Sequence, residues 1–132
     1  MADTLITVDT PGRITLPGSD EAFVVPSGQA VTLHEVIVDQ PAPGAVIYRF
    51  RFLAPAITRD GGTMDFEASI ADMQQLCDTY AVQHLTAPLP ETVQVIIAFS
   101  DKILPFGETD PDTTQFFMPF AIENGVCVLE PF

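Results

Sequence analysis

The clearest pattern along the chain is an alternation of apolar and polar residues in two neighbouring runs, Val31 to Val38 and Ala45 to Leu53. Both runs are rich in β-branched and aromatic residues, and prolines and a glycine separate them, so the pattern predicts a β-hairpin. Pairing Val38 with Ala45 places the apolar side chains of both strands on one face, apart from Glu35. Since a slip of one residue turns a strand over, this pattern selects the register.

The opposite face of the predicted hairpin gathers cationic side chains. In this register His34 lies opposite Arg49, and Thr32 lies opposite Arg51. Arginine binds carboxylates and phosphates through two parallel hydrogen bonds, so these four residues form a candidate patch for an anion or a partner. The alternative is that the arginines pair with acidic groups of the same molecule or extend over the sheet surface.

One helix is predicted, over about residues 66–84. Asp65 is a suitable N-cap, and Pro88 and Pro90 require that the helix has ended before them. Apolar side chains recur at helical spacing. They are Phe66, Ile70, Met73, Cys77 and Tyr80, with His84 continuing the series.

Shorter β segments occupy the rest of the chain. Residues 92–99 predict a central strand, and residues 116–122 and 126–130 predict a second hairpin around the turn signal Asn124-Gly125. The N-terminal third predicts strands at Leu5 to Val8 and Arg13 to Leu16, the second closed by Pro17-Gly18.

These elements predict a single α+β domain of two layers, an antiparallel sheet of about five to seven strands packed against the one main helix. Residues 25–132 form the domain, and residues 1–24 are an N-terminal β segment or arm. The hydrophobic content of 47% is too high for a disordered chain, so the excess of acidic residues does not indicate disorder.

The chain carries 18 acidic and 5 basic residues, a formal charge of −13 over 132 residues. Three of the five cations, Arg49, Arg51 and Arg59, lie within one short stretch. Such a charge disfavours nucleic acid and anionic membranes, and it favours a basic protein partner or a cation. No apolar run approaches the roughly 20 residues of a membrane span. Monomer and homodimer both remain open.

The segment from Asp101 to Asp112 is a candidate cation loop, because Asp101, Glu108, Asp110 and Asp112 could supply oxygen ligands. Its spacing differs from that of a calcium-binding EF-hand loop. A solvated turn is the favoured interpretation, and no metal or cofactor is predicted.

Cys77 and Cys127 are both expected between the two layers, on the helix and on the last strand. Their positions leave two possibilities open, a disulfide or two free buried thiols. Neither has the cationic neighbour or the second cysteine of a redox motif, which disfavours catalysis by a thiolate.

No nucleophile motif, phosphate-binding loop or metalloprotease helix is present. We therefore predict a non-enzymatic domain that binds a protein partner. The alternative is a binder of a small ligand, an anion or a divalent cation, and an enzyme is the third possibility.

A family resemblance rests on the following segments: Val25-Pro26-Ser27-Gly28 leading into residues 31–36, Arg49-Phe50-Arg51-Phe52, Asp72-Met73 with Leu76-Cys77, Pro105-Phe106-Gly107-Glu108 with Asp110-Pro111, Gln115-Phe116-Phe117, and Gly125-Val126-Cys127. With these segments the chain resembles an alphaproteobacterial family of unknown function, of the kind found in Rhodobacter relatives. The resemblance implies an exported, periplasmic protein.

The same resemblance implies a disulfide between Cys77 and Cys127. The segment Met1-Ala2-Asp3-Thr4 does not read as a secretory leader. A cytoplasmic location is therefore the alternative.

Overall fold

The structure is a computed structural model that describes residues 7–10, 12–58, 61–85 and 92–130. Several residues used above, namely Met1 to Ile6, Arg59, Pro88 and Pro90, lie outside the described residues. The strands are β1 (Thr7–Thr10), β2 (Arg13–Ala22), β3 (Thr32–Ala42), β4 (Ala45–Leu53), β5 (Thr92–Ser100), β6 (Gln115–Glu123) and β7 (Val126–Leu129).

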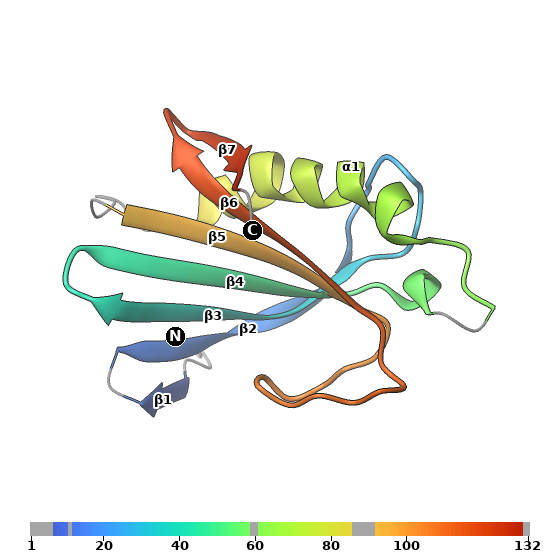
Figure 1. Cartoon of the computed structure of the whole chain (residues 1–132), viewed down its shortest axis with the longest axis horizontal. Coiled ribbons are helices and arrows are strands. Elements are labelled where there is room, and N and C mark those ends of the chain that lie inside the picture. The colour runs from blue at the N-terminus through green and yellow to red at the C-terminus, as the bar shows by residue number, and fades with distance from the viewer. Residues whose placement is uncertain (1–6, 11, 59–60, 86–91, 131–132) are drawn as a thin grey trace.

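The seven strands form one sheet in which they follow the order of the sequence (Figure 1). Every neighbouring pair is antiparallel except β4 and β5, which are parallel. The α+β class and the single main helix are confirmed, and the expectation of a wholly antiparallel sheet is corrected at this pair. The reason is the helix, because a parallel pair needs a long crossover to return the chain to the same end of the sheet.

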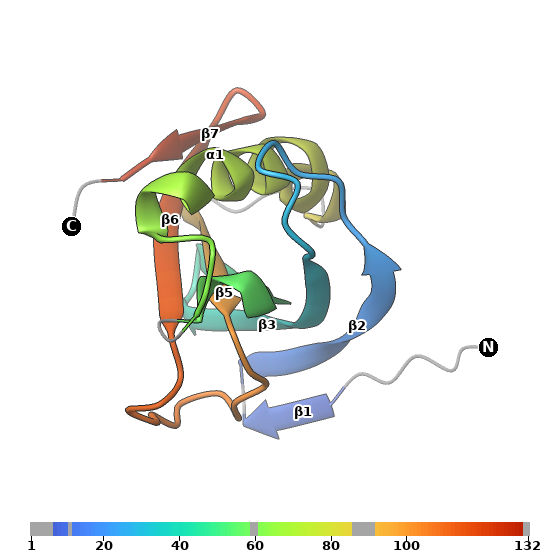
Figure 2. The ribbon, with the colours of Figure 1, turned by 90° about the vertical axis from the view of Figure 1, so that its right-hand side faces the viewer.

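The crossover contains a continuous helical segment over residues 66–84, as predicted. It consists of α1 (Phe66–Leu76), a π-helical turn (Cys77–Ala81) and a 3-10 turn (Val82–His84). The Asp65 carboxylate accepts a hydrogen bond from the Ala68 N–H at 2.8 Å, which confirms the predicted N-cap. The sheet curls around this segment, which lies in its concave side (Figure 2).

The buried side of α1 is rotated from the predicted one. Phe66 and Ile70 are 40% and 38% exposed, whereas Ser69 and Asp72 are fully buried. The cause is polar, because the chain between β2 and β3 lies over this part of the helix and hydrogen-bonds Ser69 and Asp72. The spacing of apolar residues cannot predict a helix face that is buried through hydrogen bonds of polar side chains.

The predicted hairpin exists, but its register was wrong. Val38 pairs with Tyr48 rather than Ala45, because β3 continues to Ala42 and the turn between Ala42 and Ala45 is tight. The register also shifts between Leu33 and Glu35, where a β-bulge turns the following part of β3 over. As a result the faces of β4 are as predicted, while those of β3 beyond the bulge are exchanged.

Strand β2 also runs further than predicted. It continues through Pro17-Gly18 to Ala22 and pairs with β3. A Cβ atom on Gly18 would lie 2.0 Å from the Leu33 carbonyl oxygen. The glycine therefore permits a close approach of two backbones here and is not a turn.

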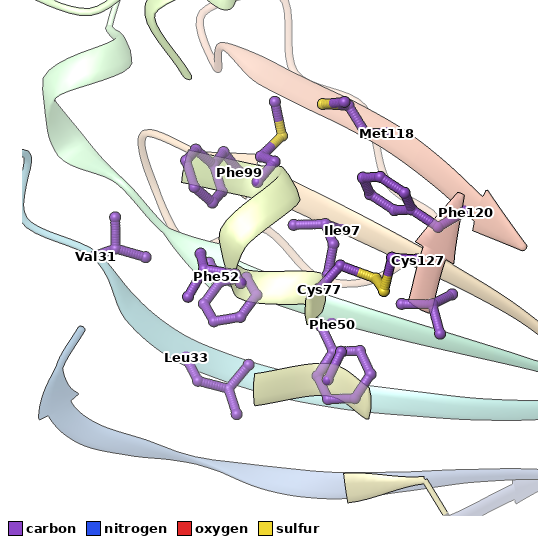
Figure 3. Close-up of a cluster of buried hydrophobic side chains, with 14 of the residues drawn as sticks. Val31, Leu33, Phe50, Phe52, Cys77, Ile97, Phe99, Met118, Phe120 and Cys127 are labelled. Carbon is purple, nitrogen blue, oxygen red and sulfur yellow. A yellow bond between two sulfur atoms is a disulfide. The ribbon is translucent and has the colours of Figure 1, made fainter. Parts of the chain in front are cut away.

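The core fills the space between the concave face of the sheet and the helix (Figure 3). Phe50, Phe52, Phe99 and Phe120 contribute the largest side chains, each at most 1% exposed. The Tyr80 ring, from the π-helical turn, packs edge-on against Phe50 at 6.0 Å and against Phe23 at 4.9 Å between ring centroids. These contacts join the helix to β4 and to the segment after β2.

A disulfide links Cys77 in the π-helical turn to Cys127 in β7, across 50 residues (Figure 3). The pairing implied by the resemblance is confirmed. Two hydrogen bonds reinforce the link: the Cys127 N–H donates to Asp78, and Gln74 donates to the Cys127 carbonyl, each at 3.1 Å. The helix is thereby attached to the last strand of the sheet.

Candidate functional site

The convex face of the sheet, which we call the outer face, changes character from one side to the other. Residues on neighbouring strands form straight rows across it, such as Arg51, Ala98 and Phe117 on β4, β5 and β6. The next row contains Arg49, Ile96 and Pro119. Each row therefore runs from a cation on β4 to apolar side chains on β5 and β6.

Three arginines lie at the charged side of this face, and two carboxylates hold them. The Asp39 carboxylate accepts from Arg13 at 3.0 Å and from Arg49 at 3.2 Å, and Glu35 pairs with Arg51. The hydrogen bond from Arg13, assisted by Arg49, holds the pKa of Asp39 below its ordinary value. The internal pairing considered for these arginines is therefore present, although it does not use all their donors.

The loop of residues 101–114, between β5 and β6, lies over the outer face (orange in Figure 2). Its base is closed by Asp101 and Thr114, whose backbones hydrogen-bond at 3.0 Å. The Thr114 N–H also donates to the Asp101 carboxylate at 2.9 Å. Above the arginines, the Leu104 carbonyl accepts from Arg51.

Phe106 is the central side chain of this loop. Its ring centroid lies 5.2, 5.4 and 5.6 Å from the Cζ atoms of Arg13, Arg49 and Arg51. A turn closed by the Glu108 N–H and the Pro105 carbonyl at 3.1 Å presents the ring. One aromatic ring thus contacts all three guanidinium groups, a favourable cation–π arrangement.

Between this loop and the sheet lies a groove of about 430 Å³. Its floor is formed by the side chains of Ile96, Ala98, Phe117 and Pro119, its roof by Phe106, and one wall by Arg49. Arg49 uses Nη1 to bond Asp39, and among the described residues its Nε and Nη2 atoms have no hydrogen-bond acceptor. The groove therefore combines apolar surface with an accessible guanidinium.

The sequence-predicted patch is only partly assembled. Arg49 and Arg51 lie in the groove wall, but Thr32 pairs with Leu53 on the neighbouring strand. His34 lies at the bulge, with Nε2 3.9 Å from the Glu35 carboxylate, and does not face Arg49. The bulge, which moved β3 out of the predicted register, is the physical reason.

Several residues of the site were missed, among them Phe106 and Phe117 in the groove lining and Arg13 beside it. Arg13 is brought in by β2, whose pairing with β3 places it opposite Asp39. Gly107, with a φ of +88°, forms the turn that presents Phe106. The Pro-Phe-Gly sequence is a turn signal that could have identified an exposed aromatic ring, but not the surface beneath it.

The four acids of the candidate cation loop do not converge. Asp101 is buried at the loop base, whereas Glu108, Asp110 and Asp112 are exposed. A hydrogen bond from the Asp112 N–H is the main cause of the lowered pKa of Asp110. Within the described part of the chain, no group of three or more His, Cys, Asp or Glu side chains could hold a metal ion.

A second polar cluster lies inside the molecule, where α1 meets the chain between β2 and β3. The fully buried Asp72 carboxylate accepts from the backbone and hydroxyl of Ser27 and from Gln29 at 2.8 Å. Gln29 also donates to Ser69 at 3.2 Å. Because Asp72 has no exposed surface, we interpret this cluster as a structural attachment of the loop to the helix.

A family of unknown function, DUF6497, matches residues 10–132 of this sequence. The chain belongs to this family. Comparison with curated proteins and with solved structures gave no match. The family assigns no chemistry, so function has to be argued from the groove. Across the described residues, no helix is both long enough and apolar enough to cross a membrane.

Proposed function

We propose that the protein is a non-catalytic binding domain whose groove takes a small anion with an apolar body. The observation that carries this proposal is the combination described above, an accessible Arg49 guanidinium beside an apolar floor under Phe106. Ligand sites are typically apolar pockets in which a few polar groups fix the orientation of the ligand.

The free donors of Arg49 support an anionic ligand even though the whole molecule is acidic. Three arginines and two carboxylates, Asp39 and Glu35, leave one positive charge at the β4 side of the groove, which Glu108 in the loop offsets. The net charge of −13 repels anions at long range, but salt screens that repulsion over about 10 Å at 0.1 M. A contact with Arg49 acts within the groove and is screened much less.

We propose binding rather than catalysis because of the kinds of side chain at hand. The described residues that line the groove include Glu108 and Thr109 but no serine, cysteine or histidine. An activated nucleophile needs an adjacent base that is oriented by a third group. The Ser27 and Asp72 pair does not qualify, because Asp72 is inaccessible to a substrate.

We also propose a periplasmic location. The Cys77–Cys127 disulfide supports an oxidising compartment, and the resemblance implies export. Intact-mass measurement of the protein isolated from its native cells tests this. A protein found in the periplasmic fraction with both cysteines resistant to alkylation is expected, and a reduced protein in the cytoplasmic fraction would contradict it.

A basic protein partner is the second candidate function, and the net charge of −13 favours it. Such a complex should weaken sharply as salt rises, because its attraction comes from exposed charges. Binding of a small anion to Arg49 should depend weakly on salt. The salt dependence of any isolated complex therefore separates the two functions.

The groove is tested by calorimetric titration of octanoate and benzoate into the wild type and two variants. Arg49→Gln should weaken binding about tenfold or more, because a charge-assisted hydrogen bond to the ligand is lost. Lys102→Gln is the matched control, since it removes the same charge from an exposed residue outside the groove lining. Absence of binding to the wild type, or equal effects of both substitutions, would refute the groove as the site.

A further inference from the structure

We infer that the ligand is a free monocarboxylate with a single apolar chain of about eight to ten carbons. It lies across the strands, with its carboxylate on Arg49 and its apolar end against Phe117 and Pro119. This inference rests on the proposed function and adds to it the class, length and direction of the ligand.

The direction follows from the rows of the outer face. Arg49 pairs with Ile96, and Ile96 pairs with Pro119, so the three side chains lie in line on β4, β5 and β6. The parallel row places Phe117 two strands away from Arg51. A ligand with its acid at β4 therefore meets apolar side chains in both rows as it crosses β5 and β6, and Gln115 is the polar residue of β6 in the groove lining.

The head group follows from the donors that remain. Arg51 bonds Glu35 and the Leu104 carbonyl, and its side chain is only 11% exposed. Arg13 does not line the groove. The side chain of Arg49 is 23% exposed and holds Asp39 through Nη1 alone. One guanidinium with two unused donors matches one carboxylate, which it can bind bidentately.

A doubly charged head group is disfavoured by the surrounding charge. The arginine cluster leaves a single positive charge, which the Glu108 carboxylate in the groove lining offsets, so a phosphate dianion meets no net positive charge there. The Glu108 carboxylate repels any anion in the groove. We therefore assign Glu108 a role in specificity, because it penalises a second negative charge on the ligand.

The length of the chain follows from the geometry of a sheet. Neighbouring strands lie about 4.8 Å apart, so the path from Arg49 to Pro119 crosses about 10 Å. An extended chain advances about 3.5 Å for every three bonds, and about 10 Å therefore corresponds to eight or nine bonds. Phe106 above and Phe117 below supply aromatic surface along this path.

The test is a titration series of straight-chain carboxylates from four to sixteen carbons, each below its micelle concentration. Affinity should rise about fourfold for each added methylene and stop rising near ten carbons. If affinity continues to rise up to sixteen carbons, or does not depend on chain length, this inference is overturned, whereas the proposal that an acid binds at Arg49 still holds. If no acid binds, the proposed function fails with it.

Variants locate the two ends of the ligand. Phe117→Ala should weaken decanoate several-fold and leave butyrate unchanged, whereas Arg49→Gln should weaken both. Phe117 is 47% exposed, so its truncation leaves the fold intact, as circular dichroism should verify. Equal losses for both acids in Phe117→Ala would overturn the proposed direction.

Head groups and lipid sources form the last arm. Decyl phosphate and decylamine should bind at least tenfold more weakly than decanoate, and Glu108→Gln should strengthen binding of decanoate and narrow the gap to the phosphate. Vesicles of phosphatidylglycerol should not sediment the protein. If decylamine binds more tightly than decanoate and Glu108→Gln weakens that binding, the inference is overturned in favour of a cationic ligand. If the protein sediments with the vesicles, a free acid is overturned in favour of a membrane lipid.

Discussion

The two faces of strand β4 carry alternate residues of one short segment, yet they have different surroundings. The inward Phe50 and Phe52 are packed against the helix, and each is 1% exposed. The outward Arg49 and Arg51 pair with carboxylates of β3 and lie under Phe106 of the loop of residues 101–114, and a groove remains beside them. Packing therefore completes the inner face, whereas the outer face keeps unused hydrogen-bond donors. We expect substitutions on one face to change stability and those on the other to change binding.

The largest difference between the inner and outer faces is expected when one aromatic residue on each face is truncated to alanine. Phe50→Ala should lower the free energy of unfolding by about 3–5 kcal/mol, because a buried ring is lost and a cavity remains. Phe117→Ala on the outer face should cost about 1 kcal/mol or less, because its ring is already half in solvent. Urea unfolding of both variants measures the difference, and similar costs would contradict the separation of roles.

The disulfide belongs to the inner face and should act on stability alone. Replacing Cys77 and Cys127 together by serine should cost about 2–4 kcal/mol, because a closed loop of 50 residues restricts the unfolded chain. Ligand affinity of the folded variant should stay within twofold of the wild type. A large loss of affinity at conserved stability would show that the helix also shapes the groove.

Substitution of the buried Asp72 tests whether hydrogen bonds on the inner face contribute to the free energy of unfolding as packing does. Asp72→Asn should cost about 1–3 kcal/mol, because the amide cannot accept all the hydrogen bonds from Ser27 and Gln29. Glu67→Gln, an exposed change in the same helix, is the matched control and should have little effect. Equal unfolding curves for the two variants would indicate that the polar attachment is dispensable.

Much of the inner face could be predicted from the sequence, because alternation and helical spacing are local signals. The faces of β4, the Asp65 N-cap and the Asn124-Gly125 turn all follow from such signals. The helix between two hairpins also identified the class of the fold. The parallel pairing of β4 with β5 was not anticipated, because it depends on where the crossover returns the chain.

The outer face depended on information that is not local. The bulge beside His34 exchanged the faces of β3, and no residue type at that position predicts a bulge. Phe106 lies more than fifty residues from Arg49 in sequence, and only the folded loop brings them to 5.4 Å. Arg49 and Arg51 could thus be identified from the sequence, but Arg13 and the carboxylate and aromatic partners could not.

The smallest expected effects are opposite responses of the two faces to pH. Arg13 and Arg49 lower the pKa of Asp39, so this contribution to stability is present above pH 3.8 and is lost as the pH falls below it. Burial, assisted by Glu21, raises the pKa of Tyr80 above 10, so stability should fall as the pH rises past 10. Urea midpoints from pH 2.5 to 11 measure both limits.

Two conservative variants assign these limits. Asp39→Asn should remove part of the acid dependence and leave the alkaline limb unchanged, and Tyr80→Phe should do the reverse. An acid limb identical in Asp39→Asn and the wild type would show that other carboxylates dominate it.

The parallel pairing of β4 with β5 has a consequence for the order in which the protein folds. Residues 54–91 separate these two strands, whereas shorter connections join all other neighbouring strands. Longer loops cost more entropy to close, and non-local contacts slow folding. We therefore expect β1 to β4 and β5 to β7 to form as two meanders that dock late along the β4–β5 seam. Stopped-flow kinetics of Ile97→Val at this seam should show faster unfolding with little change in the folding rate.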